Sequence, residues 1–212
     1  MPVGASGMAA EQRLALFPLR TVLFPAGHLP LRLFEARYLD LLRECLREDR
    51  PFGVVRITAG SEVGLEDGPP SIATVGTTAR VVDTTALPGG LLGVRVLGER
   101  RFRVLEHAVD ARGVVRARVE FLEDAPNSGD SMPGESSLGD RREVRVDVLV
   151  DALARLDPEL LEGERGVPGV AWLCHRLAER LPVGLAARQS LLECDNPRAM
   201  LERVEAWLGK ER

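Results

Sequence analysis

The chain has 212 residues and a formal net charge of −4. That length fits one large domain, or a medium domain with a small one, and the negative charge argues against a protein that binds nucleic acid through bulk electrostatics. Its three cysteines are widely spaced and its N-terminus has no apolar run typical of a signal peptide. These features predict a cytoplasmic protein without a disulfide framework and without a membrane span.

The first half of the chain is rich in short segments with the apolar alternation of half-buried strands. Residues 1–11 precede them and read as a disordered leader. We therefore predict a β-rich subdomain over residues 12–123, with an all-antiparallel sheet. Its expected strands cover residues 14–19, 28–34, 52–57, 73–85, 91–98, 100–109 and 113–124.

One helix is expected among these strands, from Glu35 to about Glu48. Its apolar residues recur with the spacing of one helical face, at Tyr38, Leu41, Leu42 and Cys45. Pro51 is expected to stop the helix and begin the next strand.

The composition changes at residues 124–139, which are rich in Gly, Ser, Pro and acidic residues and read as a flexible linker or long loop. Residues 140–212 then have helical periodicity throughout, which predicts a small α-helical bundle. Asp140 and Glu143 resemble a capping box, and Asn196 with Pro197 is typical of a helix start.

Catalytic chemistry finds little support in the sequence. Lys210, close to the C-terminus, is the single lysine, so no lysine-bearing phosphate loop and no buried Ser-Lys dyad is expected. Cys174 and His175 are adjacent on an expected helix and therefore point in different directions. No C-x-x-C, H-x-H or H-x-x-x-H spacing occurs. We expect neither enzymatic activity nor a metal or cofactor.

Arginines on the later strands are the most notable charge feature. If those strands pair, Arg101, Arg103, Arg116 and Arg118 would share an outward face. The plainer interpretation is a solvated face balanced by nearby glutamates, and the alternative is a patch that contacts an anion or RNA. By the same alternation Phe102 is predicted to be buried.

The stretch "LFPLRTVLFPAGHLPLRLFEARYLDLLREC", residues 16–45, resembles the start of the Lon protease N-terminal domain. Phe24–Pro25 and the segment Leu31, Phe34, Glu35, Arg37 and Tyr38 carry most of the similarity. Weaker matches follow at residues 52–54, 76–79 and 94–104 and at "LPVGLAARQSLLECDNPRAML" near the C-terminus. Together they cover about residues 14–208.

This resemblance implies an α+β fold, with a PUA-like antiparallel β-pseudobarrel followed by a helical bundle. It places Phe24 and Phe34 in the barrel core and Tyr38 as an anchor of the helix. Full Lon enzymes continue into an ATPase module and a Ser-Lys protease module, and this sequence departs from them because it contains neither chemistry. We therefore expect a standalone, non-catalytic substrate-binding domain that recognises unfolded polypeptide or a partner protein. A binding cleft is expected between the barrel and the bundle, with Arg37 and Tyr38 as its anchors because both lie where the helix leaves the barrel. The alternative function is a PUA-like RNA-binding module that uses the arginine face.

Overall fold

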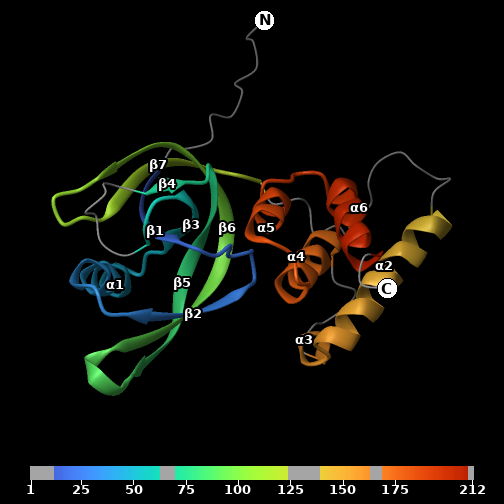
Figure 1. The fold of residues 1–212 in the computed structure, drawn as a ribbon, viewed down its shortest axis with the longest axis horizontal. Helices are drawn as coiled ribbons and strands as arrows, with labels where there is room; N and C mark the ends of the chain where they lie inside the picture. The colour runs from blue at the N-terminus through green and yellow to red at the C-terminus, as the bar shows by residue number, and fades with distance from the viewer. Residues whose placement is uncertain (1–11, 63–69, 124–138, 163–168, 210–212) are drawn as a thin grey trace, which may run out of the picture. The chain divides into compact units, whose positions relative to one another are not determined.

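The structure is a computed structural model that describes residues 12–62, 70–123, 139–162 and 169–209 (Figure 1). The chain divides into two compact units. One contains the described residues up to Leu23 and those of His28–Leu122, and the other contains Phe24–Gly27 and the described residues from Glu123 onward. The predicted leader, and residues 124–138 of the predicted linker, lie outside the described residues.

The first unit, called here the sheet unit, is built on seven paired strands. The strands are β1 Gln12–Leu19, β2 His28–Leu33, β3 Phe52–Ala59, β4 Ser71–Ile72, β5 Val75–Ala86, β6 Leu92–Val109 and β7 Val115–Phe121. They pair in the order β1-β7-β6-β5-β3-β4, and β1 also pairs with β3. That last pairing closes β1, β7, β6, β5 and β3 into a barrel, in agreement with the predicted pseudobarrel.

Two details of the sheet differ from the prediction. The pairing of β1 with β3 is parallel, so the sheet is mostly but not wholly antiparallel. The segments 91–98 and 100–109 form one continuous strand, β6, because Gly98 does not turn the chain: it pairs with Ala79 beside an irregularity in the register. Glycine inside a strand often marks such a bulge. β5 and β6 thus make a long hairpin whose tip, at the 3₁₀ turn η1 Pro88–Gly90, projects from the barrel (Figure 1).

Helix α1, Ala36–Glu48, packs on the sheet unit with the predicted face: Tyr38, Leu41, Leu42 and Cys45 are buried. Phe102 is completely buried, as predicted, in a core cluster with Leu16, Val55 and Val119. Gly53 and Gly76 leave room for its ring, because a Cβ atom at either position would lie within 2.7 Å of Phe102 Cζ.

The second unit, called here the helical unit, has α2 Gly139–Leu156, α3 Glu159–Glu162, α4 Val170–Arg180, α5 Leu185–Leu192 and α6 Pro197–Leu208. Helix α4 packs against α2, α5 and α6. Asn196 caps α6 as predicted, since its side chain accepts hydrogen bonds from the Arg198 and Ala199 amides at 2.9 and 3.4 Å. The side chains of the expected Asp140–Glu143 capping box lie outside the described part.

The segment Phe24–Gly27 belongs to the helical unit although its neighbours in sequence belong to the sheet unit. Phe24 is buried against the ring of His175 on α4, with ring centroids 4.7 Å apart. Arg176 donates hydrogen bonds to the carbonyls of Pro25 and Ala26, both at 2.9 Å. The expectation that Phe24 fills the barrel core is therefore wrong, because α4 supplies the aromatic and cationic partners that this segment takes.

Candidate functional site

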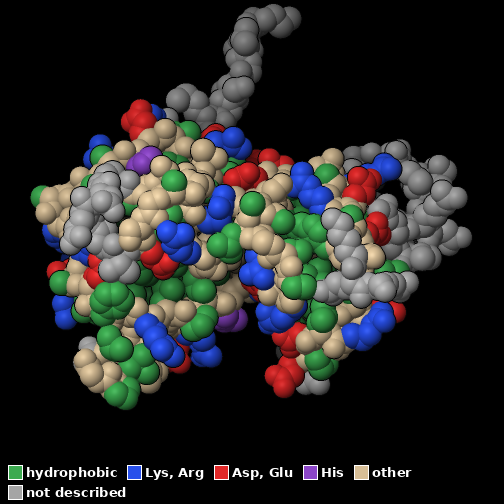
Figure 2. Space-filling view, in the orientation of Figure 1, with side chains coloured by type: hydrophobic (Ala, Val, Ile, Leu, Met, Phe, Trp, Pro, Cys, Tyr) green, Lys and Arg blue, Asp and Glu red, His purple; other side chains and the backbone are tan. Residues whose placement is uncertain are grey.

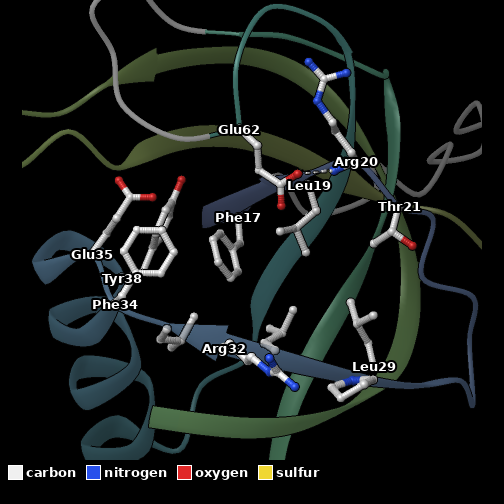
Figure 3. A pocket seen from close by; sticks show the side chains of 13 residues that line it. Phe17, Leu19, Arg20, Thr21, Leu29, Arg32, Phe34, Glu35, Tyr38 and Glu62 are labelled. Atoms are coloured by element: carbon white, nitrogen blue, oxygen red, sulfur yellow. Dashed lines mark hydrogen bonds between the residues drawn. The ribbon is translucent and has the colours of Figure 1, made fainter. Parts of the chain in front are cut away.

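A pocket of about 260 Å³ opens in the sheet unit between the end of β1, the strand β2 and the start of α1 (Figure 3). Most of its lining is apolar, and charged side chains stand around it. The lining residues are Phe17, Leu19, Arg20, Thr21, Leu29, Pro30, Leu31, Arg32, Leu33, Phe34, Glu35, Tyr38 and Glu62.

The apolar part of the pocket follows from the alternation of β2. Leu31 and Leu33 are buried in the barrel core and Leu29 packs against it, whereas Pro30 and Arg32 are exposed. Successive side chains of a strand point to opposite faces, so every second residue of β2 contributes an apolar side chain to the interior.

Two aromatic rings form one wall of the pocket. Phe17 of β1 and Tyr38 of α1 lie with ring centroids 4.0 Å apart. Phe34 also lines the pocket and is 58 % exposed, so the expectation that it fills the core is wrong. Residue 34 follows the end of β2 and precedes the helix, which takes it off the alternation that buries Leu31 and Leu33. An exposed phenylalanine at a pocket mouth is apolar surface that a ligand can cover.

Most of the charged groups at the pocket are engaged within the sheet unit. Arg20 donates from its guanidinium to the Gly60 carbonyl at 2.7 Å and from its backbone amide to Glu62 Oε2 at 3.2 Å. Glu35 pairs with Arg37 at 2.8 Å. Arg32 is exposed and has no ion-pair partner among the residues that the structure describes.

The two predicted anchors have different positions. Tyr38 lines the pocket, and burial raises the pKa of its hydroxyl to about 12, so it stays protonated. Arg37 is not among the lining residues. Its guanidinium pairs with Glu35, donates to the Gly113 carbonyl at 2.9 Å and lies 4.5 Å from the centre of the Tyr38 ring. It therefore holds the start of α1 against the β6–β7 turn. That either residue binds a ligand stays a prediction.

The four arginines expected to share an outward face do not form a continuous basic surface. Arg101 is 2 % exposed, so its predicted place on that face is wrong. A register irregularity between Thr77 and Ala79 on the paired strand lies beside it and breaks the simple alternation there. Arg103 is exposed, as expected.

The other two arginines meet acidic side chains. Arg116 pairs with Asp110 at 3.1 Å and with Glu44 at 3.3 Å. Arg118 pairs with Glu106, directly across the strand pair, at 2.7 Å. The contacts lower the pKa values of Glu44, through hydrogen bonds from Arg116, and of Asp110, through hydrogen bonds from the Val114 amide and Arg116 that outweigh its desolvation. This part of the surface carries balanced charge.

Two of the three thiols are buried, and the described residues contain no cluster of possible metal ligands. Burial raises the pKa of Cys45 to about 11 and that of Cys174 to about 12, which keeps both in the unreactive thiol form. In the described part of the chain, no group of three or more His, Cys, Asp and Glu side chains could hold a metal ion. None of the described helices has the length and apolarity needed to cross a membrane.

Comparison with known proteins assigns the class. Residues 13–210 match the model of the ATP-dependent protease La (LON) substrate-binding domain, and the chain belongs to that family. A solved Lon N-terminal domain protein from Xanthomonas campestris is 37 % identical, with a TM-score of 0.69 over 92 % of this chain and 98 % of that one. The N-terminal domain of the Mycobacterium avium complex Lon protease has the same fold, with a TM-score of 0.66 at 16 % identity.

Full-length Lon proteases match along nearly all of this chain. Lon protease 2 of Myxococcus xanthus is 28 % identical over 95 % of the chain, and the Lon protease of Escherichia coli K12 is 26 % identical over 93 %. The chain spans only about a quarter of the length of these relatives, 24 % and 25 % respectively. The similarity therefore covers only a part of each relative.

Of the predicted binding residues, Tyr38 lines the pocket, and the other lining residues were not predicted as part of a site. Tyr38 was identified through the family motif, whereas Phe17, Arg32 and Phe34 were not chosen as site residues. One local feature could have indicated that Phe34 is exposed. It is a large apolar residue that comes just after a strand, and the outward positions of that strand hold proline and arginine. The sequence pattern does not indicate where β1 lies in the barrel. In the structure β1 places Phe17 and Leu19 across the pocket from β2 (Figure 3).

Proposed function

We propose that this protein is a non-catalytic binding module whose ligand is polypeptide, either an unfolded segment or a partner protein, held in the pocket between β1, β2 and α1. The observation that carries the proposal is an apolar pocket with an exposed phenylalanine at its mouth, in a chain of the Lon substrate-binding family. Binding pockets are commonly apolar with a few polar groups that orient the ligand.

The surface of the sheet unit fits this assignment. Figure 2 shows apolar side chains gathered on the face that carries β2, with arginine side chains among them. A module that accepts many sequences is expected to bind each of them weakly, with dissociation constants on the order of micromolar, about −8 kcal/mol. Because apolar burial supplies most of that free energy, affinity should depend only mildly on salt.

The test is a titration of the purified protein with reduced, unfolded casein and with single-stranded RNA, each at two salt concentrations. We expect casein binding that changes little with salt. RNA binding through arginines would fall steeply as salt rises, because bound counterions are released. Salt-sensitive RNA binding without casein binding would overturn the proposal in favour of a nucleic-acid module.

A matched pair of variants locates the site. Phe34→Ser removes exposed apolar surface at the pocket, and Leu46→Ser removes a similarly exposed side chain (53 %) on α1 that does not line it. Burial of part of a phenylalanine is worth roughly 1.4 kcal/mol, about tenfold in affinity. We expect that loss for Phe34→Ser and none for Leu46→Ser; equal effects would place the ligand elsewhere.

A further inference from the structure

Among the strands that the structure describes, β2 is paired along one edge only. Its six residues pair with Leu92–Leu97 of β6, and no other described strand pairs with it. All residues from Leu29 to Leu33 line the pocket, those that point into the barrel and those that point outward alike. A pocket lined by both faces of a strand lies along the strand's edge. Figure 3 shows the Phe17 and Leu19 side chains across the pocket from β2.

The proline in β2 indicates which backbone groups reach the open edge. In an antiparallel pair, residues alternate between those whose N–H and C=O groups meet the partner and those whose groups point away. Proline has no N–H and is tolerated where that group would point away from the partner strand. Pro30 therefore takes an outward position, and so does Arg32 two residues later. At the pocket, the open edge therefore presents the carbonyl of Pro30 and both the amide and the carbonyl of Arg32.

We propose that bound polypeptide joins the sheet unit as an additional strand on the open edge of β2. This inference rests on the proposed function and specifies how the ligand is held. The ligand's backbone would exchange hydrogen bonds with Arg32 and donate to the Pro30 carbonyl. Its alternate side chains would enter the pocket toward Phe17 and Tyr38. Strand addition binds through main-chain groups that every sequence has, and pockets for alternate side chains then select among sequences.

Charge narrows the ligand class further. The Arg32 guanidinium stands at the pocket without an ion-pair partner among the described residues, while Arg20, Glu35 and Glu62 each have a contact in the sheet unit. The ligand that fits is an extended segment with apolar residues at alternate positions and an acidic residue opposite Arg32. Electrostatic complementarity of this kind fixes register more than it adds affinity.

The composition of β2 also explains how its open edge can avoid pairing with unrelated strands. Exposed edges invite aggregation, and proteins protect them with short strands, proline and charge. β2 has all three protections, and Pro30 leaves the edge a single amide donor at positions 30 and 32. A partner must therefore supply pocket-filling side chains as well as a free backbone, which is consistent with weak, selective binding.

The experiment uses a synthetic octapeptide, acetylated and amidated, in which valine or leucine alternates with serine and one serine is replaced by aspartate. Two N-methylated versions carry their methyl groups on alternate amides, one on the odd positions and one on the even. An added strand turns only one of these sets toward β2. We expect one version to bind at least tenfold more weakly than the parent peptide and the other to bind nearly as well.

Two readouts on the protein complete the test. The Arg32 amide in the unmodified protein should exchange more slowly with deuterium when peptide is bound, as measured by nuclear magnetic resonance. Arg32→Glu should weaken binding of the aspartate peptide several-fold and favour a version with lysine at that position. Arg103→Glu makes the same charge change at an exposed site away from the pocket and should do neither.

The outcomes separate this inference from the proposed function. Casein binding that Phe34→Ser weakens, with both N-methylated peptides equal to the parent or with no protection of the Arg32 amide, overturns strand addition and leaves the binding module in place. Casein binding with no binding of the parent octapeptide does the same. Absence of polypeptide binding overturns both.

Discussion

Two Phe-Pro steps occur close together in the sequence, Phe17–Pro18 and Phe24–Pro25, and they belong to different units. Phe17 packs with Tyr38 and Phe52 in the barrel, an environment made of apolar and aromatic groups. Phe24 stacks on His175 beside the buried Arg176, an environment that contains charge. The same dipeptide thus packs in an apolar core in one unit and beside a hydrogen-bonded ion pair in the other. The side chains that pack against it determine which environment it has.

The apolar core of the sheet unit should show the largest response to truncation. Phe102→Ala removes a completely buried ring around which two glycines are packed, and little can collapse into the space. We expect a loss of about 3–5 kcal/mol in the free energy of unfolding. Urea unfolding followed by circular dichroism measures it. A midpoint equal to that of the unchanged protein would mean that the core relaxes around the cavity.

The ionic contact of the helical unit is expected to come next. Arg176→Met leaves the carbonyls of Pro25 and Ala26 without their donor and removes the 3.0 Å contact of Glu179, which keeps Arg180 at 3.8 Å. Removal of one member of a buried pair costs about 3–5 kcal/mol. We expect the lower end, because Glu179, whose pKa burial already raises, can take up a proton.

Arg180→Met is the matched control for that contact. Arg180 pairs with Asp157 at 2.7 Å and lies 3.8 Å from Glu179, but its side chain is far more exposed than that of Arg176, so its loss should cost less than about 1 kcal/mol. Fluorescence of Trp172 and Trp207, which are both in the helical unit, follows the unfolding. Equal losses of unfolding free energy for the two variants would show that the burial of Arg176 does not increase the cost of removing it.

Gly27 tests how tightly the Phe24–Gly27 segment fits. A Cβ atom there would lie 2.5 Å from Glu179 Oε1 and 2.9 Å from the Phe24 carbonyl. Gly27→Ala should cost roughly 1–3 kcal/mol through overpacking. Gly209→Ala adds a methyl group where nothing lies within 4 Å, at a residue with the helical backbone angles φ −71° and ψ −19°, and should change the stability little. Calorimetric melting temperatures of the two variants make the comparison; a stable Gly27→Ala protein would mean that the Glu179 side chain moves aside freely.

Local patterns predicted the parts of this fold that depend on local physics. The buried face of α1, the Asn196 cap and the burial of Phe102 follow from helical or strand periodicity, which a short window of sequence contains. The parallel pairing of β1 with β3 and the placement of Phe24–Gly27 with α4 depend on partners distant in sequence. No window around either segment contains that information.

The candidate site divides in the same way. Tyr38 was expected because a family motif marks it, and it lines the pocket. Arg37 belongs to the same motif, but it does not line the pocket. Its contacts with Glu35 and Gly113 give it a structural role. The expected exposure of Arg101 failed because a strand irregularity shifts the alternation, and sequence periodicity cannot register an irregularity whose cause lies in the paired strand.

The smallest expected effect concerns pH, and it has opposite signs in the two units. Burial raises the pKa of Glu179 above its ordinary value of 4.5, so its stabilising contribution is complete below that value and is lost as pH rises through the folded-state pKa. Hydrogen bonds from Arg116 lower the pKa of Glu44, so its contribution is present above pH 4.5 and is lost as pH falls through the folded-state pKa.

Relative to the unchanged protein, Glu179→Gln should therefore become less destabilising as pH rises from 4 to 8. Glu44→Gln should become more destabilising, by less than about 1 kcal/mol because the pair is partly exposed. Urea midpoints for the three proteins at several pH values give both slopes. Slopes of the same sign would show that the two carboxylates do not differ in environment as the structure places them.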